Sequence, residues 1–122
     1  MATILVIEDN AANLTLVQFL LEQAGHTILS ARDAELGIVL ASERHCELIL
    51  MDVHLPGMDG LEATAVLKRT EATRAIPIIA LTALAMAGDE ARIRAAGCDG
   101  YIAKPIDYRL FLATVSAHLV CT

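Results

Sequence analysis

The sequence contains no tryptophan, and only two tyrosines and two phenylalanines occur among its 122 residues. Hydrophobic residues nevertheless make up 56% of the chain. A core with so few rings must be built from Ala, Val, Ile and Leu, which suit closely packed helices and buried parallel strands. This apolar content also excludes an intrinsically disordered chain, since disorder requires low hydrophobicity.

Cysteine is scarce as well. Cys46, Cys98 and Cys121 are widely spaced and form no C-x-x-C pair. An odd number of cysteines at such spacing fits neither a disulfide framework nor a zinc site. We interpret them as structural or incidental thiols, mostly buried.

Long hydrophobic runs are absent too. The mean hydropathy is +0.56, but no apolar run approaches the roughly 20 residues that a membrane-spanning helix needs. No basic region precedes a hydrophobic stretch at the N-terminus, so we expect no signal peptide and a cytoplasmic location. The length of 122 residues predicts a single domain over residues 1–122, because it suffices for one core and not for two.

Basic charge is limited. Nine Lys and Arg residues against fifteen Asp and Glu residues give a formal charge of -6 and a pI near 5.0. A nucleic-acid surface requires clustered Lys and Arg to displace counterions from phosphates. We therefore expect protein partners and no binding to nucleic acid or membrane.

Short runs of aliphatic and β-branched residues recur along the chain. They predict five strands, at residues 4–7, 27–29, 48–51, 78–81 and 101–103. Between these runs, apolar residues recur at intervals of three or four, as at Leu14, Val17 and Leu21, which predicts helices. Gly25 and Gly97 stand where two of the helices should end in a left-handed conformation. Continuously apolar strands that alternate with helices indicate an α/β fold, a doubly wound parallel sheet covered on both faces.

Polar side chains follow four of the five predicted strands. Glu8 and Asp9 follow the first, Asp52 the third, Thr82 the fourth and Lys104 the fifth. Ligands of doubly wound sheets bind at the carboxyl ends of the strands, so these residues are candidates for one site.

The acidic residues of this group predict a metal site. Two unit charges 4 Å apart repel by about 4 kcal/mol at an effective dielectric of 20, so clustered carboxylates require a cation. Carboxylates without cysteine or paired histidine select Mg²⁺ over zinc or copper. The alternative is that the acids only cap helices, with Asp9 or Asn10 at the first helix and Asp59 at the third.

Four ordered segments carry a resemblance to a known family: ILVIEDN at residues 4–10, MDVHLPGMDG at 51–60, LTA at 81–83 and YIAKP at 101–105. The chain resembles the receiver domains of bacterial two-component response regulators, of which CheY is the best-known type. The resemblance implies a five-stranded sheet in the order 2-1-3-4-5 with five helices, as in flavodoxin and CheY.

The resemblance also implies residue roles. Asp52 is the expected phosphate acceptor. Glu8, Asp9, Asp52 and the backbone carbonyl of Val53 are the expected ligands of Mg²⁺, for which Mn²⁺ can substitute. A carboxylate that attacks an anionic phosphoryl group needs such charge neutralisation.

Further residues are expected to contact or report the phosphate. By resemblance, Thr82 and Lys104 contact the phosphoryl oxygens, Tyr101 is the switch aromatic, and the Lys104-Pro105 bond is cis. A phosphate adds acceptor oxygens toward which the Thr82 hydroxyl can turn, vacating space for an aromatic ring. Lys104 is expected to have an exposed ammonium that matters little to stability.

Two further residues are predicted to modulate the phosphate lifetime. His54 lies two positions after Asp52, and Leu84 lies two positions after Thr82. Both are expected to overhang the phosphoryl group where hydrolytic water approaches. The alternative is that they are exposed loop residues without effect.

Two other classes of protein share this fold or chemistry. A flavodoxin-like carrier cradles phosphate with hydroxyls and backbone N-H groups after the first strand, where this chain has Glu8 and Asp9. An aspartyl-phosphate phosphatase of the haloacid dehalogenase type needs a second acid where this chain has His54. Site chemistry therefore disfavours both.

The predicted function is that of a signalling phosphoacceptor with intrinsic self-phosphorylation and autodephosphorylation chemistry, and not of an enzyme. Its expected partners are a histidine kinase or histidine phosphotransfer protein, and a downstream protein that reads the fourth helix, fifth strand and fifth helix, about residues 88–119. The oligomeric state is expected to be monomer or weak homodimer. Residues 82–90 and 97–98 resemble cell-division regulators of the DivK type, which favours a single-domain regulator. The alternative is a receiver segment of a hybrid histidine kinase or multidomain response regulator.

Overall fold

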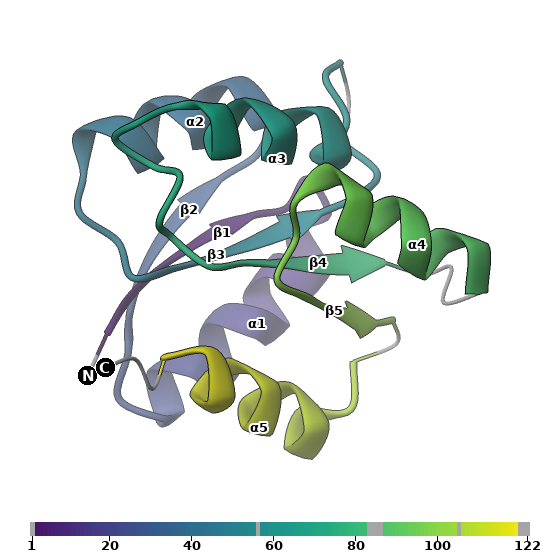
Figure 1. Cartoon of the computed structure of the whole chain (residues 1–122). Coiled ribbons are helices and arrows are strands. Elements are labelled where there is room, and N and C mark those ends of the chain that lie inside the picture. Colours follow the sequence, from purple (N-terminus) through teal and green to yellow (C-terminus); the bar gives the residue numbers. More distant parts are fainter. Residues whose placement is uncertain (1, 56, 83–86, 105, 120–122) are drawn as a thin grey trace.

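The computed structural model describes residues 2–55, 57–82, 87–104 and 106–119, and for residues 87–89 it describes the backbone alone (Figure 1). Strands and helices alternate along the described residues. They are β1 (Thr3–Ile7), α1 (Ala11–Gln23), β2 (Thr27–Ala31), α2 (Ala34–Glu43), β3 (Leu48–Asp52), α3 (Gly60–Arg69), β4 (Ile78–Thr82), α4 (Ala87–Ala96), β5 (Gly100–Ala103) and α5 (Tyr108–Leu119).

The five strands form one parallel sheet in the order β2-β1-β3-β4-β5. Helices α1 and α5 cover one face, while α2, α3 and α4 cover the other (Figure 1). Right-handed crossovers place helices on both faces of such a sheet. The predicted α/β class, strand order and number of helices are confirmed.

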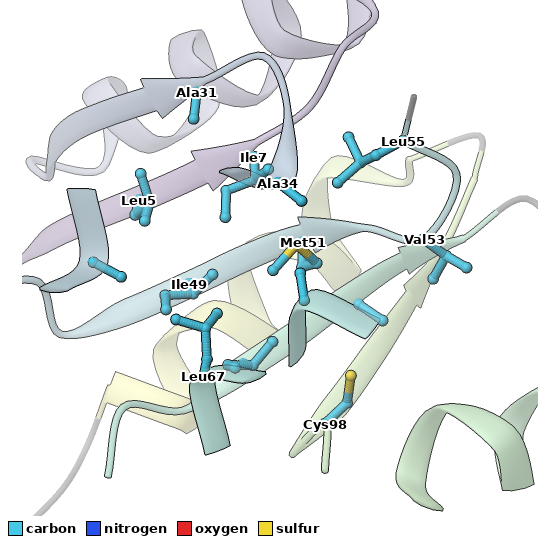
Figure 2. Close-up of a cluster of buried hydrophobic side chains, with 14 of the residues drawn as sticks. Leu5, Ile7, Ala31, Ala34, Ile49, Met51, Val53, Leu55, Leu67 and Cys98 are labelled. Atoms are coloured by element: carbon cyan, nitrogen blue, oxygen red, sulfur yellow. The ribbon is translucent and has the colours of Figure 1, made fainter. Parts of the chain in front are cut away.

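Apolar residues fill the space on both sides of the sheet. Every residue of β3 and β4 is buried, as expected for central strands with helices on each face. One cluster, shown in part in Figure 2, joins residues of the sheet such as Leu5 and Ile49 to Leu67 of α3. The other cluster contains the only fully buried aromatic residue among those described, Phe111. Aliphatic side chains therefore supply the core, as the composition predicted.

Side-chain caps fix where the helices begin. Asn10 Oδ1 accepts the N-H of Asn13 at 3.0 Å, and Asp59 forms a reciprocal capping box with Glu62. The capping alternative is thus correct for Asn10 and Asp59. Asn10, not Asp9, caps α1, so helix capping leaves Asp9 for another role.

Several local predictions can be compared with the structure directly. Gly25 and Gly97 have φ angles of 94° and 111° at the ends of helices, which confirms their expected left-handed conformation.

Cys46 and Cys98 are buried free thiols, and burial raises the pKa of Cys46 to about 11. Cys121 lies outside the described residues. No helix in the described part of the chain is both long enough and apolar enough to cross a membrane.

Candidate functional site

Four parallel strands end at the same edge of the sheet and carry the candidate residues there. Glu8 and Asp9 follow β1, Asp52 ends β3, Thr82 ends β4, and Lys104 follows β5. Because β1 and β3 are neighbours, the acidic residues at their carboxyl ends lie side by side. The register of the sheet therefore assembles side chains up to 96 positions apart in the sequence.

Glu8, Asp9 and Asp52 form an acidic cluster. Each offers one carboxylate oxygen, and these oxygens all lie within 4.8 Å of one another. Glu8 and Asp52 are 1% and 3% exposed, whereas Asp9 is exposed. The cluster thus has a buried floor and an open side at Asp9, where an ion or a second reactant can approach.

Lys104 lies between the two buried carboxylates. Its Nζ is 3.1 Å from Glu8 Oε1 and 3.4 Å from Asp52 Oδ2. The N-H of Lys104 donates to the carbonyl of Thr82 at 2.7 Å, which fixes the residue beside β4. The expectation of an exposed ammonium is wrong, because the Lys104 side chain is only 17% exposed. Pairing with two buried acids keeps it at the floor of the site.

The pKa of the Glu8 carboxyl is raised well above its ordinary value. Burial is the main cause and, with the neighbouring Asp52, raises its pKa to about 7. Lys104 and the N-H of Asn10, which donates to Glu8 Oε2 at 3.2 Å, act in the opposite direction. The cluster therefore holds its full negative charge poorly without additional positive charge.

Backbone groups hold the end of β3 in place. The N-H of His54 donates to Asp52 Oδ1 at 3.0 Å, and the N-H of Gly60 donates to the Val53 carbonyl at 3.0 Å. A Cβ at Gly60 would collide with the backbone carbonyl of Asp52. Gly60 thus permits the start of α3 to pack directly against the strand that carries Asp52. Sequence reasoning missed this role, although a glycine directly after the capping residue Asp59 was a usable signal.

The predicted switch residues occupy neighbouring strand ends. Thr82 is buried at the end of β4. Tyr101 of β5 is half-buried, and its hydroxyl donates to Glu90 Oε1 of α4 at 3.2 Å. Glu90 was not predicted to have a role, because no sequence pattern links it to Tyr101.

The predictions about phosphate lifetime and about the peptide bond before Pro105 stay predictions. The His54 side chain is exposed beside Asp52. Leu84 and Pro105 lie outside the described residues, so the predictions of a phosphate-shielding leucine and of a cis peptide bond stay predictions.

Residues 4–116 match the response regulator receiver domain family. The chain belongs to this family. It is therefore a receiver domain of two-component signal transduction, a signalling phosphoacceptor, as predicted. Receiver domains interact with histidine kinases and with downstream targets.

Known relatives extend over nearly the whole chain. The polar-differentiation response regulators DivK of Brucella ovis and Brucella abortus are 44% identical to this receiver domain, over 96% of its length and 95% of theirs. The receiver domain of the sensor histidine kinase PA1611 from Pseudomonas aeruginosa is 32% identical, with a TM-score of 0.91 and 98% of each chain covered. That structure has a magnesium ion coordinated in its active-site cleft.

The fold is shared with chemotaxis proteins. The structure of CheY4 from Vibrio cholerae is 25% identical and has a TM-score of 0.92, with 98% of this chain and 99% of that one covered. The CheY-like architecture predicted from the sequence is thereby confirmed.

Proposed function

We propose that this receiver domain accepts a phosphoryl group on Asp52 while Mg²⁺ is bound by Glu8, Asp9, Asp52 and the Val53 carbonyl. The observation that carries the proposal is the cluster of three carboxylates with Lys104 against its two buried members. Asp52 is the acid best suited to be the nucleophile. It ends the central strand β3, and its Oδ1 is held by the His54 N-H while Oδ2 faces Lys104.

The donor set fits a magnesium ion. Mg²⁺ prefers oxygen ligands at about 2.1 Å in octahedral geometry, which places ligand oxygens roughly 3 to 4 Å apart. Oxygens that already lie within 4.8 Å of one another need only a small contraction to meet this requirement. The same oxygen donors suit Mn²⁺. The ion supplies positive charge that lets an anionic phosphoryl group approach an anionic carboxylate.

The chain's own residues orient and neutralise the reactants. Asp52 attacks phosphorus, so that a P-O bond forms while the P-N bond of a donor phosphohistidine breaks. The electron pair of that bond returns to the imidazole, which leaves neutral when its other nitrogen carries a proton. Lys104, already 3.4 Å from Asp52 Oδ2, supplies a cation for the transferred phosphoryl oxygens.

The signal is proposed to leave through Thr82 and Tyr101. A phosphate on Asp52 adds charge and acceptor oxygens to the end of β3, and the end of β4, with Thr82, lies beside it. If the Thr82 hydroxyl turns toward the phosphate, Tyr101 can move into the vacated space. This motion would change the surface of α4, β5 and α5, which we propose as the face for the downstream partner.

The 44% identity with DivK over nearly full lengths supports a DivK-like single-domain regulator. Such a protein would receive phosphate from a histidine kinase or histidine phosphotransfer protein and act in the cytoplasm through protein contacts, as a monomer or weak homodimer. A receiver segment of a hybrid histidine kinase is the second candidate, because the PA1611 receiver domain is also similar. Affinity of the natural full-length product for a downstream protein, with and without phosphate, distinguishes the two.

Labelling with a small phosphodonor tests the phosphoacceptor. Acetyl phosphate with Mg²⁺ should add one phosphoryl group to the isolated chain, detectable as a mass increase that hydroxylamine removes. Asp52→Asn and excess chelator should each abolish the increase. Asp59→Asn is the matched control, because this acid lies at the end of the connection that follows Asp52 and asparagine preserves helix capping. A label that persists in Asp52→Asn, or forms equally well with chelator, contradicts the proposal.

A further inference from the structure

A cleft opens beside the acidic cluster, on the side of the sheet edge formed by β1 and β2. It has a volume of about 420 Å³ and is lined by Asp9, Arg32, Asp33 and Leu36. We call it the Asp9 cleft. Asp9 follows β1, whereas the other three residues belong to the β2-α2 connection and the first turn of α2. None of these three has a place in the phosphoryl chemistry described above.

The wall formed by α2 begins at a capped helix end and presents an apolar side chain. Asp33 caps the helix, since its Oδ1 accepts the N-H of Leu36 at 2.8 Å. This bond fixes the backbone of Leu36, whose side chain is 45% exposed and borders the cleft. Arg32, also exposed, is the only basic residue among the described residues that line the cleft. The apolar side chain of Leu36 and the positive charge of Arg32 thus lie next to the acidic cluster.

The cleft adjoins the acidic cluster, because Asp9 belongs to both. A protein donor must bring its phosphohistidine to Asp52, and the Asp9 carboxylate lies within 4.8 Å of that of Asp52. Standard protein interfaces bury about 800 Å² per partner, equivalent to a disc of roughly 16 Å radius. A disc of that size centred on Asp52 extends over Asp9 and the adjoining cleft. A small phosphodonor covers no such area.

We propose that the Asp9 cleft is part of the docking surface for the histidine-phosphorylated donor protein, and that Leu36 and Arg32 contribute to recognition of this donor. The proposal rests on the proposed phosphotransfer to Asp52. Leu36 packs against an apolar side chain of the donor, and Arg32 attracts an acidic one. Both residues act on donor binding, while the chemistry at Asp52 proceeds without them.

Two kinds of donor separate docking from chemistry. The protein donor is the purified histidine kinase that, among those encoded with this chain, phosphorylates it fastest after labelling with radioactive ATP. The small donor is phosphoramidate, which has the same P-N bond as phosphohistidine but no protein surface. Phosphorylation rates are measured with both donors for wild type, Leu36→Ser, Arg32→Glu and Val39→Ser. Val39 is the matched control, since it is 46% exposed on the same helix and does not line the cleft.

Leu36→Ser and Arg32→Glu should each lower kcat/KM for the kinase by roughly tenfold, the range seen when a buried interface contact is removed, mainly through KM. Rates with phosphoramidate should stay within about twofold of wild type, and Val39→Ser should match wild type with both donors. Equal behaviour of Leu36→Ser and Val39→Ser overturns the docking role of Leu36. An equal loss with both donors shows that the substitutions disturb the site itself and also overturns the proposal. Failure of phosphoramidate to label wild type refutes the proposed function instead.

Discussion

The hydroxyl of Tyr101 lies 3.2 Å from Glu90 Oε1 and donates a hydrogen bond to it, linking β5 to α4. Arg94, one turn further along α4, lies 3.4 Å from the other carboxylate oxygen of Glu90. The only large apolar side chain that α4 buries among its described residues is Ile93. The bond from Tyr101 is therefore a substantial part of what positions the middle of α4.

The first prediction concerns this bond. A Tyr101 ring that moves toward Thr82 must leave Glu90, so the bond favours the arrangement seen here. Glu90→Ala and Tyr101→Phe should each shift the equilibrium constant between the two arrangements by roughly two- to tenfold, in favour of the one in which Tyr101 has left Glu90. This factor corresponds to the net free energy of one hydrogen bond. By linkage, affinity for Mg²⁺ with beryllium fluoride, a phosphoryl mimic, should rise by the same factor. Calorimetry and amide chemical shifts of α4 and β5 measure both effects.

A double substitution makes this prediction specific. Glu90→Ala combined with Tyr101→Phe should have the effect of one substitution alone, because either removes the same bond. Arg94→Ala is the control, since it removes the ion pair and leaves the bond from Tyr101. Additive effects would show that the two residues act separately.

Tyr101→Ala should preserve phosphorylation of Asp52 yet weaken phosphate-dependent partner binding.

The second prediction concerns Lys104→Ala. This substitution leaves the buried acids Glu8 and Asp52 without their cation, which should cost about 1 to 3 kcal/mol of unfolding free energy in chelator. Added Mg²⁺ should restore most of the loss, whereas phosphorylation by acetyl phosphate should stay impaired. Urea unfolding and labelling measure the two quantities.

Lys68→Ala is the matched control for Lys104→Ala. Lys68 is also partly buried, and its Nζ bonds Asp99 and the carbonyl of Ile76 at 3.0 Å. These partners lie just before β5 and β4, at the edge of the sheet opposite to the acidic cluster. Loss of the Lys68 side chain should lower stability equally with and without Mg²⁺, and labelling should be normal. If Lys104→Ala behaves in the same way, Lys104 is structural.

The third prediction is a pH dependence set by Glu8. Its pKa is raised to about 7 from the ordinary 4.5, so the folded protein binds this proton more tightly than the unfolded chain. Its contribution to stability is fully present below pH 4.5 and is lost as pH rises through 7. In chelator, the unfolding free energy of wild type relative to Glu8→Gln should therefore fall across this interval.

Magnesium should reverse the preference for the protonated form. Mg²⁺ requires the Glu8 carboxylate, so its affinity should fall as pH decreases through about 7 while binding releases a proton. Titration calorimetry in buffers of different ionisation enthalpy measures that proton. A pH-independent affinity between pH 6 and 8 would contradict the raised pKa.

The fourth prediction concerns phosphate lifetime. The His54 side chain is exposed, and its backbone N-H donates to Asp52. His54→Ala therefore removes the side chain predicted to lie over the phosphoryl group and preserves the backbone hydrogen bond. Dephosphorylation of His54→Ala or Leu84→Ala should change by a factor of about two to ten, equivalent to roughly 0.4 to 1.4 kcal/mol of activation free energy. Loss of label after donor removal measures it. His45→Ala, an exposed histidine ahead of β3, should have no effect, and unchanged lifetimes in both test variants would refute the role.

Much of the site follows from the sequence because parallel strands have one polarity. Once five apolar runs are identified as strands of a doubly wound sheet, the residues directly after them must lie at one edge. Chain order alone therefore places five candidate residues at this edge: Glu8, Asp9, Asp52, Thr82 and Lys104. The acids among them then indicate a cation, whereas the phosphoryl group was implied by the resemblance to receiver domains.

Tertiary structure decided the contacts that depend on side-chain packing. Lys104 could be solvated or lie against Glu8 and Asp52. Which of these occurs depends on how closely the ends of β1, β3 and β5 approach one another, and no local sequence pattern encodes that distance. The bond from Tyr101 to Glu90 depends on how α4 packs over β5, and the Asp9 cleft on how far the start of α2 stands from the end of β1. The sequence by itself determined which residues reach the edge of the sheet, since strand polarity needs only chain order. Only the packed fold decided which of their atoms meet, because those distances arise from the joint fit of elements remote in the chain.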